Sequence, residues 1–203
     1  MAHIALIGAS GQAGSRLLKE LSDRGHTVTA IARNPDKIAR LKNVTARQGD
    51  VFDKDGLAAL LKGHDAVISS VHFTASNPKA LIEAVRTSGV KRYLVVGGAG
   101  SLEVAPGKRL YDTPTFPAQY KEEASKGGAF LDLLKGETDL DWTFLSPSAM
   151  FVPGERTGTF RLGKDTLLSN ATGSSISFED YAVAMVDEIE KPAHSRQRFT
   201  VGY

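Results

Sequence analysis

The chain contains no cysteine among its 203 residues. This absence excludes a disulfide framework and any metal site built on thiolates. Its five histidines show no metal-ligand spacing, so we expect no bound metal. No apolar run approaches the ~20 residues that span a bilayer, and the first strand candidate begins too early to leave room for a signal peptide. We therefore expect no membrane association and a cytoplasmic location.

Neither positive nor negative charge is concentrated in any part of the chain. The 25 basic residues nearly balance the 23 acidic ones, giving a formal net charge of +2. The basic residues are scattered, and no basic run alternates with aromatic residues, so we expect no nucleic-acid partner. At this length we expect one domain over residues 1–203, as a monomer or a homodimer, with a substantial core.

Three evenly spaced glycines follow the first apolar segment, residues 4–7. The run 8–14 is Gly-Ala-Ser-Gly-Gln-Ala-Gly, and it leads into a segment whose apolar residues fall on one helical face. Strand, glycine-rich turn and helix predict a site for a dinucleotide pyrophosphate, because glycine allows close backbone approach and the helix N-terminus offers free N–H groups. The alternative is a tight turn without a ligand. The residues expected to bind the cofactor here are Gly8, Ser10, Gly11, Gln12, Ala13 and Gly14.

Arg33 follows the second predicted strand, residues 26–32, where the adenosine ribose is expected. Sites that prefer NAD(H) usually place an acidic residue at this point to bind the ribose 2′-hydroxyl. A guanidinium can instead bind a 2′-phosphate with two hydrogen bonds. We therefore predict NADP(H) as the preferred cofactor, with NAD(H) possible. The alternative is a solvated arginine near Asp36.

Strand and helix patterns alternate through the first two-thirds of the chain. This alternation predicts an α/β fold: a Rossmann-like, doubly wound, mostly parallel sheet with helices on both faces and a small C-terminal strand excursion. A glycine- and proline-rich loop is expected over 98–116, and strands near 159–162 and 166–168. The predicted strands are 4–7, 26–32, 44–48, 66–69, 92–96, 142–145 and 198–201. The predicted helices are 15–21, 55–62, 77–89, 118–134 and one that starts at a capping box, 177–180.

The carboxyl ends of these strands should line one crevice, where open α/β sheets bind ligands. The position of Asp50 fits two roles equally well. Its carboxylate can accept a hydrogen bond from the adenine amine, or it can stabilise a loop or cap a helix. The glycines after the fifth strand suit close approach to a flat ligand, or simply form a turn. The cofactor-binding residues expected at these ends are Asp50, Val51, Ser69, Ser70, Val71, Gly97 and Gly98.

These residues together resemble the atypical short-chain dehydrogenase/reductase group. Within it, the chain is most similar to small NAD(P)H-binding, NmrA-like proteins, which include NADH-flavin reductase-like and epimerase-like members. The resemblance covers essentially the whole chain and implies a Rossmann-type domain with bound NADP(H). The segments that carry it are 8–14, 32–35, 49–51, 95–102, 142–147 and 176–182.

One feature of the wider group is missing from this chain. Typical members use Tyr-x-x-x-Lys for proton transfer, but no tyrosine here has lysine four residues later. Hydride transfer needs chiefly positioning, so we predict a reductase of a flat conjugated acceptor such as a flavin or quinone. Ser101 and Tyr120 are the candidate catalytic residues; the alternatives are a turn cap and an exposed helix face. A dinucleotide-sensing binding protein and an epimerase- or dehydratase-like enzyme are the other functions considered.

Overall fold

Eight strands form one sheet at the centre of the protein, in the order β10-β12-β8-β5-β4-β1-β2-β3. The computed structural model describes residues 1–203. All neighbouring strands are parallel except β10, which runs antiparallel to β12 at one edge. The strands are β1 (His3–Ile7), β2 (Thr27–Ala32), β3 (Val44–Gln48), β4 (Ala66–Ser69), β5 (Arg92–Val96), β8 (Asp141–Pro147), β10 (Arg161–Gly163) and β12 (Gln197–Gly202).

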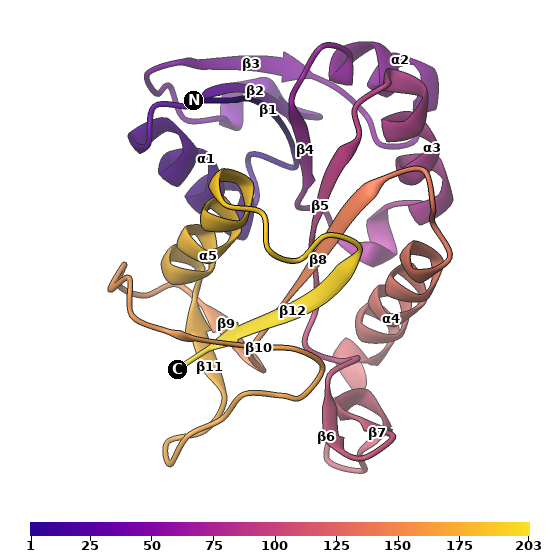
Figure 1. Cartoon of the computed structure of the whole chain (residues 1–203), viewed down its shortest axis with the longest axis vertical. Coiled ribbons are helices and arrows are strands. Elements are labelled where there is room, and N and C mark those ends of the chain that lie inside the picture. The colour runs from indigo at the N-terminus through magenta and orange to yellow at the C-terminus, as the bar shows by residue number, and fades with distance from the viewer.

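Helices cover both faces of this sheet (Figure 1). Helices α1 and α5 lie together on one face, and α2, α3 and α4 lie on the other. Successive side chains of a strand point to opposite faces of the sheet, so each strand contributes to the core on both faces. Ile4 and Leu6 of β1 belong to one buried cluster, whereas Ala5 and Ile7 belong to the other. The helices are α1 (Gln12–Asp23), α2 (Lys54–Leu61), α3 (Pro78–Ser88), α4 (Lys121–Lys135) and α5 (Phe178–Glu190).

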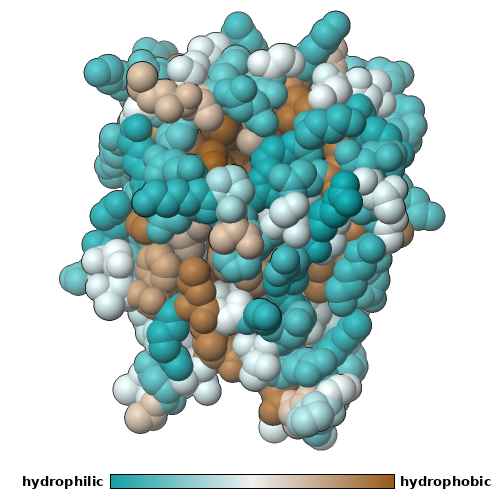
Figure 2. Space-filling view, viewed as in Figure 1, coloured by the Kyte–Doolittle hydropathy of each residue, from teal (hydrophilic) through white to brown (hydrophobic).

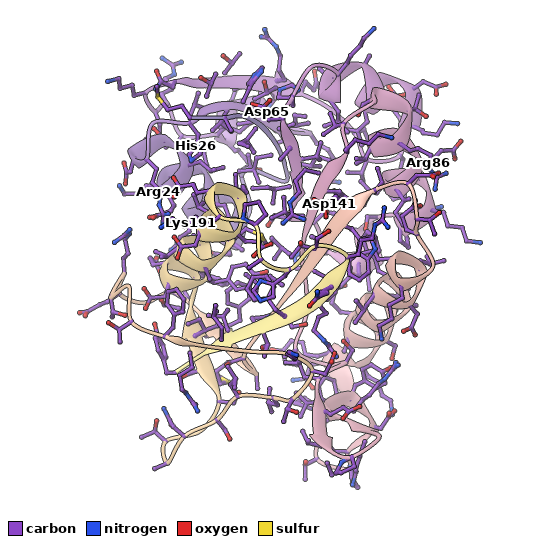
Figure 3. All side chains as sticks on the ribbon, viewed as in Figure 1. Arg24, His26, Asp65, Arg86, Asp141 and Lys191 are labelled. Carbon is purple, nitrogen blue, oxygen red and sulfur yellow. The ribbon has the colours of Figure 1, made fainter.

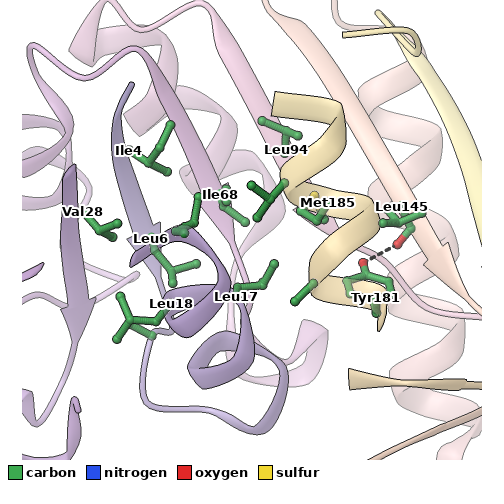
Figure 4. Packing of buried hydrophobic residues seen from close by; sticks show 14 of the residues in the cluster. Ile4, Leu6, Leu17, Leu18, Val28, Ile68, Leu94, Leu145, Tyr181 and Met185 are labelled. Atoms are coloured by element: carbon green, nitrogen blue, oxygen red, sulfur yellow. Dashed lines mark hydrogen bonds between the residues drawn. The ribbon is translucent and has the colours of Figure 1, made fainter. Parts of the chain in front are cut away.

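Aliphatic side chains from α1 fill the core between this helix, the sheet and α5 (Figure 4). Leu17 and Leu18 are fully buried there, as is Met185 of α5. Tyr181 is buried in the same layer, and its hydroxyl donates to the Leu145 carbonyl at 2.7 Å. Burial raises the pKa of this phenol well above its ordinary value, so the hydroxyl stays protonated and bonded to the backbone of β8.

Helix ends follow the signals in the sequence. Asn77 accepts hydrogen bonds from the first turn of α3, and Gly89 ends that helix with a left-handed φ of +83°. Ser177 caps α5 by accepting from the Asp180 N–H at 2.9 Å. The second half of the predicted capping box does not form, because Asp180 instead accepts from the Gly158 N–H at 2.7 Å. This carboxylate therefore holds the segment that precedes β10 against α5.

The C-terminal third differs most from the sequence prediction. Strand 161–163 forms within the expected region, but 166–168 contributes one isolated bridge and no strand. The predicted loop 98–116 contains a short hairpin, β6 (Glu103–Ala105) with β7 (Lys108–Arg109). A parallel pair, β9 (Met150–Val152) with β11 (Ser175–Ser177), was not predicted. These strands have only three residues, which is too short for the alternation of apolar and polar residues that would predict them from the sequence.

The surface is predominantly hydrophilic in the view of Figure 2, with apolar residues in small groups between polar ones. None of the helices combines the length and the apolar composition that crossing a membrane requires. This finding agrees with the composition of the sequence.

A network of ion pairs joins α1, α5 and the segment before β10. Arg24 and His26 lie beside the end of α5 (Figure 3), where Arg24 contacts Asp187 at 2.6 Å. The carboxylate of Glu20, only 5% exposed, contacts Arg24 at 2.7 Å and Arg156 at 2.8 Å. Burial alone would raise the pKa of Glu20, but the hydrogen bonds from Arg156 and Arg24 hold it below its ordinary value.

We expect Glu20→Gln to lower the free energy of unfolding at pH 7 by about 2–3 kcal/mol, because two arginines lose a buried partner. Since the folded-state pKa of Glu20 is depressed, its contribution is present above the unfolded-state pKa and is lost as the pH falls through the folded-state value. Urea denaturation at a series of pH values should show the two proteins converging at acid pH. Asp23→Asn is the control, because its pair with Lys19 is exposed and worth at most about 0.5 kcal/mol. Equal losses for the two variants would contradict this interpretation.

Candidate functional site

A crevice of about 590 Å³ opens at the carboxyl ends of the central strands. Strands β1 and β4 are neighbours, and the chain proceeds from β1 toward β2 and β3 but from β4 toward β5 and β8. Such a reversal is where open parallel sheets bind ligands, and the volume falls within the range of small-molecule sites. Predicted residues that line it are Gly8, Ser10, Gly11, Gln12, Ala13, Arg33, Asp50, Val51, Ser70, Val71, Gly97, Gly98 and Tyr120.

Two glycines fix the turn between β1 and α1. Gly8 adopts a φ of +82°, and a Cβ at this position would lie 2.0 Å from the Ser70 carbonyl oxygen. A Cβ at Gly14 would lie 2.1 Å from the Gly8 carbonyl oxygen, so the first turn of α1 packs directly on the preceding loop. Gly14 is buried and does not line the crevice. Its role in the structure is to let the helix approach the strand.

The start of α1 leaves backbone donors without partners. The N–H groups of Ser10, Gln12, Ala13 and Gly14 donate to no protein atom. Gly11 is the N-cap and supplies no side-chain hydrogen bond, and the first turn holds no acidic residue. Such an end carries a partial positive charge and attracts anions. The loop therefore fits the pyrophosphate of a dinucleotide.

Arg33 and Asp50 line the same side of the crevice, after β2 and β3. The Arg33 guanidinium is exposed and makes no ion pair or hydrogen bond with the protein. This exposure is compatible with both predictions for Arg33, the 2′-phosphate ligand and the solvated arginine near Asp36. One oxygen of Asp50 accepts from the Phe52 N–H at 2.9 Å, which is the loop role considered for it. Its second oxygen makes no protein hydrogen bond.

The packing of the sheet accounts for the residue types at Ser69 and Gly97. Ser69 does not line the crevice: it is 1% exposed, and its hydroxyl pairs with the Tyr93 hydroxyl at 2.9 Å. Alternation along β4 turns this side chain into the core, and Ser70 lines the crevice instead. Gly97 does line it, but a Cβ there would lie 2.3 Å from the Phe144 ring. Packing against β8 therefore requires glycine at this position.

Aromatic and apolar residues also line the crevice. Tyr120 lies there with 60% of its surface exposed, so it is accessible and makes no polar contact with the protein. Phe151 also lines the crevice. Phe151 packs edge-on against Phe178, with ring centroids 4.4 Å apart. Apolar side chains thus line the same crevice as the free backbone donors.

His72 and Glu123 also line the crevice, although neither was predicted from the sequence. The His72 Nδ1 lies 3.3 Å from a Glu123 oxygen, and the carboxylate also accepts from the N–H groups of Phe73 and Thr74 at 2.7 and 2.8 Å. Burial acts to raise the pKa of Glu123, but hydrogen bonds from Thr74 and Phe73 lower it below its ordinary value. Glu123 therefore stays ionised and ties α4 to the loop after β4.

Ser101 is not at the crevice, which corrects its prediction as a catalytic residue. It is 5% exposed, and its hydroxyl accepts from the Arg198 guanidinium at 3.1 Å in a separate hollow. The backbone turns between Ala99 and Leu102, where the Leu102 N–H donates to the Ala99 carbonyl at 2.9 Å. This turn carries Ser101 away from the glycine residues that do line the crevice.

A glycine turn with free N–H groups, at the point where a parallel sheet reverses direction, defines a dinucleotide-binding protein of the Rossmann type. The sequence profile of the NAD(P)H-binding family matches residues 8–192. The chain therefore belongs to the NAD(P)H-binding family.

Relatives of similar length share this architecture. The uncharacterized protein YwnB of Bacillus subtilis is 45% identical over 98% of this chain and 97% of its own length. The crystal structure of an epimerase candidate from Bacteroides thetaiotaomicron is 44% identical, covers 99% of this chain and 96% of that one, and superposes with a TM-score of 0.94. A candidate NADH-flavin reductase from Streptococcus pneumoniae is 37% identical, covers 100% and 99%, and gives a TM-score of 0.84.

Proposed function

We propose that the protein is an NADPH-dependent oxidoreductase that reduces flat conjugated acceptors such as flavins or quinones. The observation that carries the proposal is a single crevice that is lined both by the free backbone donors of α1 and by aromatic side chains. The similarity to the Streptococcus pneumoniae protein, described as an NADH-flavin reductase candidate, supports the acceptor class.

Different groups of the crevice bind different parts of the cofactor in this proposal. The N–H groups at the start of α1 bind the diphosphate, and Arg33 binds the 2′-phosphate that distinguishes NADPH from NADH. When bound, the nicotinamide supplies a hydride, which carries two electrons to the acceptor. Phe151 and Phe178 present ring faces and edges to a flat acceptor and exclude water from it.

The proton that accompanies the hydride comes from water in this proposal. The crevice is lined by one tyrosine, Tyr120, and by no lysine. No side chain there forms the Tyr–Lys pair expected of an epimerase, so the structure offers less support for epimerase chemistry. A conjugated acceptor stabilises the charge that it gains, and the reduced acceptor then takes one proton from solvent.

Turnover of NADPH with menadione or flavin mononucleotide, followed by loss of the nicotinamide absorbance, tests this function. We expect multiple turnovers, and we expect Tyr120→Phe to retain the wild-type rate within about threefold. A loss of roughly 10²-fold or more in this variant would instead identify the phenol as a general acid. Tight nucleotide binding without turnover across a panel of flavins, quinones and azo compounds would contradict the reductase proposal and favour a dinucleotide sensor.

A further inference from the structure

A second hollow, of about 370 Å³, lies on the side of the protein between β12 and α4. Figure 1 shows these two elements flanking the region, with the β6–β7 hairpin below them. It shares no lining residue with the crevice. The nucleotide site therefore does not account for this hollow.

Basic side chains outnumber acidic ones around the hollow. Five cationic and two anionic residues line it. Lys164 and Arg196 have no carboxylate within ion-pair distance, while Arg109 and Lys135 share Asp132 at 3.7 and 3.8 Å. A concave surface with an excess of one sign concentrates ions of the opposite sign.

Buried polar groups form the base of this hollow. The side chain of Arg198 is 5% exposed, and its guanidinium donates to Ser101 and contacts Asp165 at 2.7 Å. Trp142, the single tryptophan of the chain, is 3% exposed and also lines the hollow. Its indole N–H has no hydrogen-bond partner, which is rare for a buried donor. The base of the hollow is therefore a buried arginine that Ser101 and Asp165 hold in place, and not a set of solvated side chains.

We propose that this hollow binds a small, multiply charged anion, either a phosphate compound or a polycarboxylate. Lys164 and Arg196 supply the uncompensated charge at the rim, and the guanidinium of Arg196 can bind two oxygens of one group. The Arg196 donors at present bond only to main-chain carbonyls of Leu140 and Thr138, which leaves its charge without a counterion. This binding is independent of the proposed reductase activity.

The single tryptophan makes the site directly observable. Titration of pyrophosphate, and separately of citrate, is followed by the one indole N–H signal in the ¹H–¹⁵N NMR spectrum at low ionic strength. Saturating NADP⁺ is present throughout, so that anion binding in the crevice does not contribute. We expect at least one of the two anions to shift the indole signal saturably, and the more tightly bound one identifies the chemical source of the ligand.

Charge-removing variants decide whether the lining binds the anion. Lys164→Gln should weaken the apparent affinity about fivefold or more without affecting the fold, because Lys164 is exposed and makes no side-chain contact. Arg196→Gln should weaken it about tenfold or more. Lys62→Gln, an exposed lysine outside the hollow, is the control and should leave the affinity unchanged. No saturable shift with either anion, or equal affinity in all three variants and the wild type, would overturn the proposal.

Discussion

Replacing Gly14 by alanine should abolish nucleotide binding and lower the free energy of unfolding by about 3 kcal/mol or more. The new Cβ would lie 2.1 Å from the Gly8 carbonyl oxygen and 3.0 Å from its carbonyl carbon. Gly8 cannot move away easily, because its own Cβ position is 2.0 Å from the Ser70 carbonyl oxygen and its φ is +82°. The start of α1 would have to shift, and with it the donors of the pyrophosphate loop.

Urea denaturation and a fluorescence titration with NADPH measure the two effects of the Gly14 substitution. The matched control is Gly136→Ala, at the end of α4, where φ is −86° and the new Cβ would lie 3.5 Å from the nearest carbonyl oxygen. We expect this control to change stability by less than about 1 kcal/mol and to bind NADPH normally. A Gly14→Ala protein with wild-type stability and affinity would show that the turn is looser than the structure indicates.

Arg33→Ala should weaken NADPH binding by about 1.5–3 kcal/mol, the range for hydrogen bonds to a charged group. This corresponds to roughly 10- to 150-fold in Kd. NADH lacks the 2′-phosphate, so its Kd should change by less than about threefold. The guanidinium is exposed and bonds to no protein atom, which means that its removal should not affect folding.

Parallel titrations of NADPH and NADH into wild type and Arg33→Ala separate the possible outcomes. Lys191→Ala, which removes an exposed charge beyond α5 and outside the crevice, is the control for a general loss of positive charge. Equal weakening of both cofactors would mean that Arg33 does not select the phosphate. Unchanged binding of both would place the adenosine end of the nucleotide elsewhere.

The alternating part of the fold was predictable because each signal is local. Strands 44–48, 66–69 and 92–96 have the predicted bounds, and α3 begins after Asn77 and ends at Gly89, as helices commonly do at these two residue types. The pairing of β9 with β11 depends on residues 25 positions apart and on strands of three residues. No local pattern in the sequence contains that information.

The candidate site was predictable to the extent that the backbone determines it. Residues at strand ends share an edge of the sheet whatever their side chains are, so most of the residues expected to bind the cofactor line one crevice. Ser69 and Ser101 do not, because one strand position and one tight turn decide which way each side chain faces. His72 and Glu123 meet across 51 positions of sequence, and this contact follows only from the packing of α4 on the loop after β4.

Amide hydrogen exchange, measured by NMR with and without saturating NADP⁺, tests most directly whether the loop after β1 holds the diphosphate. The N–H groups of Ser10, Gln12 and Ala13 line the crevice and have no protein acceptor, so they should exchange fast alone and become protected when phosphate oxygens bind them. Protection at these three amides is the predicted result. Saturable nucleotide binding that leaves all three exchanging as before, or no binding at millimolar nucleotide, would contradict the account.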